Sequence, residues 1–129
     1  MSKILTEISA GELLDKISIL EIKIAKIKDQ FLLDQVKKEY QILSDTKNKK
    51  IKFSKEVEKL FNDLKKLNEK LWIIEDEIRM CESNSDFKDK FIQLARDVYF
   101  NNDKRAKVKS EINKLLGSNI KEIKQYSNY

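Results

Sequence analysis

The fold is decided by the stretch from Ser54 to Ser83, SKEVEKLFNDLKKLNEKLWIIEDEIRMCES. Its apolar residues recur at alternating steps of three and four, which places them on one face of an α-helix. This seam consists of Val57, Leu60, Leu64, Leu67, Leu71, Ile74, Ile78 and Cys81. With Ser54 as N-terminal cap, the pattern predicts a helix of about 28 residues, ~42 Å long. Phe61, Trp72 and Ile73 lie off the seam, so the helix is expected to contact more than one neighbour.

Helical periodicity extends to both sides of this stretch. Ser9 followed by Glu12 fits a capping box, and a 4-3-4-3 apolar seam continues from there to about Lys28. Residues 33–43 repeat the same rhythm. Residues 45–53 then lose the period and concentrate lysine, which indicates a loop between hairpin partners.

The C-terminal third allows two interpretations. Residues 83–86 read as a break that starts another helix, whose seam leads to the polar residues Asn101 and Arg105. Either that helix ends at the Asn-Asn-Asp sequence beginning at Asn101 and a fifth helix follows, or it runs through with polar groups facing inward. Gly117 suits a left-handed C-terminal cap, and residues 118–126 are then expected to form a short last helix.

The predicted fold class is therefore all-α, with one helical domain over residues 1–129. We expect an elongated bundle of antiparallel, coiled-coil-like hairpins, with four to five helices and one long central helix at about 54–83. Apolar residues make up 40% of the chain and charged residues 38%, and no uncharged apolar run approaches the ~20 residues of a membrane span. The N-terminal residues are too charged for a signal peptide, so a cytoplasmic protein without a membrane span is expected.

The residue inventory excludes several kinds of chemistry. The chain has no histidine, which removes most zinc sites and every Ser–His or Cys–His nucleophile pair. Two glycines are too few for a phosphate-binding glycine loop, and the lone Cys81 is interpreted as a core residue. Glu12 and Asp15 have a spacing that Mg²⁺ sites use, but a solvated acidic face explains them better. We therefore expect no metal, no cofactor and no assigned catalytic residue.

The basic character of the chain is a weak indication of nucleic-acid binding. The net charge is +5, but only three of the 27 basic residues are arginine. Nucleic-acid interfaces usually add arginine or exposed aromatic rings to such a charge. A nucleic-acid partner is therefore not expected.

The polar stretch between Trp72 and Asn113 is where a binding site is predicted, because it holds the single tryptophan and all three arginines. Arginine offers a planar, two-pronged donor set that suits carboxylates and phosphates. Glu75 and Arg79 are four residues apart and share a helix face. The candidate residues are Trp72, Glu75, Asp76, Arg79, Arg96, Tyr99, Asn102, Asp103, Arg105, Lys109 and Asn113.

Two interpretations of these residues remain open. In the first they form ion pairs between helices, and the chain is a non-catalytic binding or scaffold module. The apolar girth and length of the central helix then predict a homodimer, with a protein partner as a further possibility. In the second, Arg79, Arg96 and Arg105 recognise an anionic ligand, a phosphate or a sugar nucleotide, in a ligand-binding protein or enzyme. A closed network with carboxylates favours the first interpretation, and a solvent-open cleft favours the second.

Several short blocks of the sequence contain polar residues that neither helix capping nor apolar periodicity requires. They are ISAGELLDK (8–16), LWIIEDEIR (71–79), ARDVYFNNDKRA (95–106) and the closing GSNIKEIKQYSNY (117–129). In these blocks the chain resembles a family of small bacterial helical proteins classed as a domain of unknown function. The resemblance covers nearly the whole chain and is weakest over residues 34–58. It implies no activity, cofactor or catalytic residue.

Overall fold

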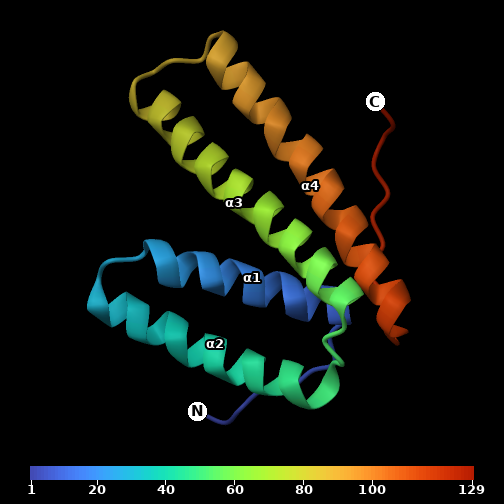
Figure 1. Cartoon of the computed structure of the whole chain (residues 1–129). Coiled ribbons are helices and arrows are strands. Elements are labelled where there is room, and N and C mark those ends of the chain that lie inside the picture. Colours follow the sequence, from blue (N-terminus) through green and yellow to red (C-terminus); the bar gives the residue numbers. More distant parts are fainter.

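The computed structural model describes residues 1–129 and contains four helices and no strand (Figure 1). The helices are α1 (Ala10–Lys26), α2 (Gln30–Lys50), α3 (Lys55–Ser83) and α4 (Asp89–Leu116). α1 and α2 form one hairpin, and α3 and α4 form a second, longer one (Figure 1). The predicted all-α hairpin architecture is confirmed, and α3 is the predicted long helix. None of the four helices combines the length and apolar character that crossing a membrane requires.

Short side chains begin the helices where the sequence predicts. Ser9 Oγ accepts a hydrogen bond from the backbone N–H of Glu12 at 3.1 Å. Ser54 Oγ accepts one from the N–H of Val57 at 3.3 Å. Each bond satisfies a backbone donor that has no partner within its helix. Gly117 ends α4 in the left-handed region at φ 63°, as predicted.

The prediction of a loop at residues 45–53 is wrong for most of that segment. α2 continues through Lys50, and only Ile51–Ser54 connect it to α3. Lysine is a good helix former, and lysines in the last turn interact favourably with the negative end of the helix dipole. A solvated helix end therefore needs no apolar period to remain helical.

The two interpretations of the C-terminal third are also resolved. α4 runs unbroken past Asn101, whose Nδ2 donates to the carbonyl oxygen of Asp97 at 2.8 Å. Asn101 is buried and Arg105 pairs with Asp15 of α1, so α4 runs through with polar groups facing inward and no fifth helix begins there. The predicted short last helix is wrong, because residues 118–129 contain no helical turn. They run back beside α4 instead (Figure 1).

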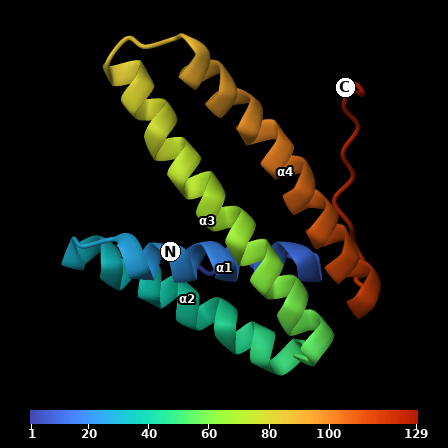
Figure 2. The same ribbon diagram turned by 45° about the horizontal axis from the view of Figure 1, so that its top comes forward.

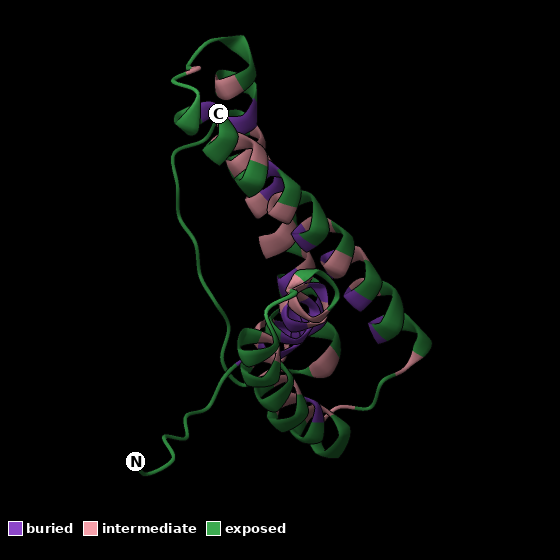
Figure 3. Ribbon diagram, turned by 90° about the vertical axis from the view of Figure 1, so that its left-hand side faces the viewer, coloured by how far each residue is buried: buried purple, intermediate pink, exposed green.

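The main core lies where α3 crosses α1, and we call this region the crossing (Figure 2). α1 contacts all three other helices, whereas α2 packs only on α1. α1 is also the most buried helix (Figure 3). The core of the crossing consists of Leu13, Leu14, Ile17, Val57, Phe61, Leu64 and Ile112. It joins the two hairpins through apolar residues from α1, α3 and α4.

Beyond the crossing, α3 and α4 extend together as an arm (Figure 1). The arm has a smaller core of Ile74, Cys81 and Leu94, with partly buried Leu71, Ile78, Phe91 and Val98 around it. All of these residues come from α3 and α4. Cys81 is buried, as the sequence predicts. The arm core is therefore a two-helix layer.

Candidate functional site

Asp15, on the buried face of α1, is the centre of a polar network. Its side chain is 1% exposed. One carboxylate oxygen accepts from Arg105 Nε at 2.9 Å and from Asn68 Nδ2 at 2.8 Å, and the other accepts from Arg105 Nη2. Burial alone would raise the pKa of Asp15, but the hydrogen bonds from Arg105 and Asn68, together with the charges of Arg105 and Lys109, lower it. The ionised carboxylate thus ties α1 to both α3 and α4.

Lys109 extends this network to the end of the chain. Its Nζ lies 2.7 Å from Glu12 Oε2, 3.1 Å from Glu122 Oε2 and 3.6 Å from Asp15 Oδ2. Burial would lower the pKa of Lys109, but these three carboxylates raise it. In turn the hydrogen bond from Lys109 lowers the pKa of Glu122. The ion pairs of Lys109 therefore connect α1 and α4 to the C-terminal segment.

Asn113 of α4 binds the backbone at the start of α1. The backbone N–H of Gly11 donates to Asn113 Oδ1 at 2.7 Å, and that of Ala10 donates to Ser118 Oγ at 3.1 Å. A Cβ at Gly11 would lie 2.6 Å from the carbonyl oxygen of Lys109. The two helices approach so closely that only glycine fits, and Asn113 acts as a cap supplied by another helix.

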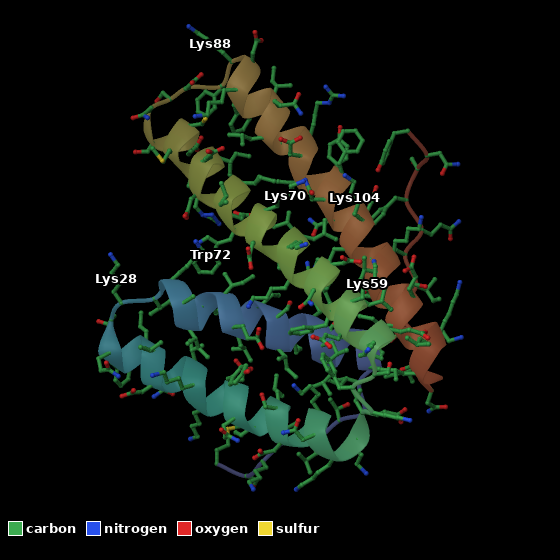
Figure 4. All side chains as sticks on the ribbon, in the orientation of Figure 1. Lys28, Lys59, Lys70, Trp72, Lys88 and Lys104 are labelled. Atoms are coloured by element: carbon green, nitrogen blue, oxygen red, sulfur yellow. The ribbon has the colours of Figure 1, made fainter.

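A groove of about 510 Å³ opens between α1 and the arm, and Trp72 lies in it between α1 and α3 (Figure 4). It is lined by Ile19, Ile22, Asn68, Leu71, Trp72, Glu75, Asp76, Arg79, Asn102 and Arg105. Arg79 Nη1 pairs with Glu75 Oε2 at 3.0 Å, with both side chains exposed. Arg105 is held by Asp15 at the base of the groove. Each arginine here already has a carboxylate partner.

A second cavity of about 680 Å³ lies between α4 and the C-terminal segment. It is lined by Val98, Tyr99, Asn102, Asp103, Arg105, Lys124, Tyr126, Ser127 and Tyr129. The hydroxyl of Tyr129 donates to Asp103, and this bond raises the pKa of Tyr129. The ring of Tyr129 packs edge-on against Tyr99 and Phe100, with centroids 5.6 and 5.2 Å away. These contacts hold the end of the chain over the cavity.

The candidate residues therefore lie in separate places. Six line the groove: Trp72, Glu75, Asp76, Arg79, Asn102 and Arg105. Five lie under the C-terminal segment: Tyr99, Asn102, Asp103, Arg105 and Lys109. Arg96 is in neither set, and its guanidinium lies 5.7 Å from the centroid of the Phe100 ring. The three arginines do not meet around one ligand position.

Sequence reasoning missed the residue at the centre of the network. It placed Asp15 on a solvated acidic face, whereas Asp15 is buried and faces cations of α4. The available signal was Asn68, which lies beside the apolar seam between Leu64 and Leu71, seven residues after Phe61. A polar residue at such a position needs a buried partner. Acidic and cysteine side chains do not gather in groups of three or more that would hold a metal ion.

A family model described as a family of unknown function, DUF6165, matches residues 4–129. The chain belongs to this family. The DUF6165 match covers all four helices and the C-terminal segment, so it confirms the resemblance to a domain of unknown function. No curated protein and no solved structure matches the chain.

Proposed function

We propose that the chain is a non-catalytic helical binding module that self-associates through the arm. The observation that carries this proposal is the two-helix core of the arm. An isolated pair of helices leaves part of each apolar stripe facing water, whereas a four-helix bundle encloses the stripes completely. A second copy of the arm would supply the two missing helices. The proposal includes the cytoplasmic location expected from the sequence.

Exposed apolar side chains on the arm support the proposal. Ile73 and Met80 are seven residues apart on α3 and are 52% and 61% exposed. That spacing places both on one stripe of the helix. Phe87 and Ile92, at the start of the returning chain, are also exposed. Such residues gathered on a projecting element are typical of an interaction surface.

The pairing of the cations argues against the anionic-ligand interpretation of Arg79, Arg96 and Arg105. A phosphate bound by Arg105 would have to replace Asp15, and breaking a buried ion pair costs about 3–5 kcal/mol. Arg79 would have to leave Glu75, and Arg96 lies elsewhere. The network has the closed form that favours a scaffold.

Sedimentation velocity at tens of micromolar tests the proposal. We expect a species with twice the mass of the chain, and we expect the double variant Ile73→Glu with Met80→Glu to be monomeric. The matched control is Ile42→Glu, which adds a carboxylate at an exposed position of α2 and should leave the dimer intact. A monomeric natural protein, or a dimer that survives the double variant, contradicts association through this face.

A further inference from the structure

Six charged side chains gather where the C-terminal segment meets α4. They are Arg105, Lys109, Lys124, Glu12, Asp15 and Glu122. Without Glu122 the set holds three cations and two carboxylates, which leaves one positive charge. Glu122 cancels that charge, since its carboxylate lies 3.1 Å from Lys109 Nζ and 3.6 Å from Lys124 Nζ. The five groups other than Glu122 are therefore complementary to one anionic group, a place that Glu122 takes in the structure.

Glu122 differs from the other two carboxylates in how it is held. Glu12 and Asp15 belong to α1, and Asp15 is buried in the packing of that helix. Glu122 belongs to an exposed segment without helical structure, and its side chain is 43% exposed. It is the carboxylate that leaves without moving a helix.

The space around Glu122 continues into the tyrosine-lined cavity. A cavity of about 230 Å³ beside Glu122 shares Asn102, Arg105 and Lys124 with the larger one of about 680 Å³. One end of the combined space is cationic, and the other is lined by tyrosine rings. Aromatic rings favour stacked or edge-on contact with another ring. The charge and the rings together define one class of ligand.

We propose that this space binds a small aromatic monocarboxylate, and that Glu122, which belongs to a C-terminal strap of residues 117–129, competes with the ligand for the cations. The carboxylate of the ligand replaces Glu122 on Lys109 and Lys124, and its ring packs against Tyr99. In the absence of ligand, Glu122 supplies the charge and Tyr129 covers the cavity. The inference is independent of self-association, because none of these residues belongs to the core of the arm.

A titration of the full chain with phenylacetate, followed by heteronuclear NMR, tests the proposal. We expect amide shifts in α4 around Tyr99 and Lys109 and in the strap. Glu122→Gln should bind phenylacetate more tightly, by up to about fivefold, because it removes a partly exposed ion pair that competes with the ligand. Lys124→Gln and Tyr99→Leu should each weaken binding.

The controls test separately the charge of the ligand, the aromatic ring of the ligand and the position of the removed carboxylate. Glu111→Gln changes an exposed carboxylate of α4 that lines neither cavity and should bind as the natural protein does. Cyclohexylacetate and phenylacetamide should bind more weakly than phenylacetate, because one lacks the aromatic ring and the other the charge. Phenyl phosphate should also bind more weakly, because its phosphate group carries more than the one negative charge that the cations lack without Glu122.

Three results would overturn the proposal. They are no shifts in either the natural protein or Glu122→Gln, equal binding of phenylacetate and phenylacetamide, and shifts outside α4 and the strap. Unchanged melting temperatures of Lys124→Gln and Tyr99→Leu would show that their loss of binding is not a loss of fold.

Discussion

The crossing and the arm use the same apolar rhythm but bury their residues to different extents. At the crossing, Leu14 and Leu64 are 0% exposed, because α1, α3 and α4 enclose them together. In the arm, Ile74 and Leu94 stay 8% and 6% exposed between two helices. The apolar residues thus form a core of seven buried side chains where three helices meet and a core of only three where two helices pack alone.

The polar residues follow the same division. The crossing holds the buried carboxylate of Asp15 with partners from two other helices. The arm carries the exposed pair between Glu75 and Arg79, within one turn of α3. Buried pairs are costly to break and exposed pairs contribute little. Substitutions that remove one partner of an ion pair are therefore expected to cost more at the crossing than in the arm.

Removing the buried carboxylate should have the largest effect. Asp15→Ala leaves Arg105 and Lys109 without their shared partner and should lower the free energy of unfolding by about 3 kcal/mol or more. In the arm, Glu75→Ala should cost less than about 0.5 kcal/mol. Urea denaturation measures both losses, provided that the unfolding free energy keeps the same dependence on urea concentration. Equal losses for the two variants would contradict the distinction between the crossing and the arm.

The second largest effects are expected when one leucine of each core is replaced by alanine. Leu64→Ala at the crossing should cost about 3 kcal/mol, because its fully enclosed site cannot collapse around the missing atoms. Leu94→Ala in the arm should cost about 2 kcal/mol, because its neighbours and solvent fill the space more easily. Both losses are read from the same urea curves. A larger loss for Leu94→Ala would show that the arm is the tighter core.

Glycine substitutions should test how closely α1 and α4 approach at the crossing. Gly11→Ala places a Cβ against backbone and should cost about 1–3 kcal/mol, as overpacking does. Gly117→Ala meets no atom within 4 Å, so only its left-handed backbone should count, at about 1 kcal/mol. Thermal unfolding compares the two variants. A neutral Gly11→Ala would mean that α1 is free to shift on α4.

Acid should produce the smallest change, because it acts only at low pH. The pKa of Asp15 in the folded chain lies below its ordinary value of 3.8, so the unfolded chain binds the proton more readily. The stabilisation is complete above that value and is lost as the pH falls through the lower, folded pKa. Chemical denaturation across this range should show a steeper loss for the natural protein than for Asp15→Asn. Parallel curves would contradict the role of the ionised carboxylate.

The sequence by itself determined where α1 and α3 begin and that α3 is the long helix. Capping by Ser9 and Ser54 and the 3-4 seam of α3 depend on residues that are close together in the chain. A single sequence is therefore enough to predict their effect. The sequence also marked Arg105 and Lys109 as candidates, because they lie in the polar stretch that holds the single tryptophan and all three arginines. The lysine-rich end of α2 was misread because helix propensity there acts without any apolar pattern.

Only the tertiary structure decided which polar residues are buried and with whom. Asp15 lies 53 residues from Asn68 and 90 from Arg105 along the chain. Local periodicity carries no information about pairs so far apart, since their contact depends on the angle at which the hairpins cross. The return of the chain beside α4 after Gly117 brought Glu122 onto Lys109, and the crossing left the arm with two helices. The physical reason is that burial is a property of the packed helices, whereas capping and period belong to each helix alone.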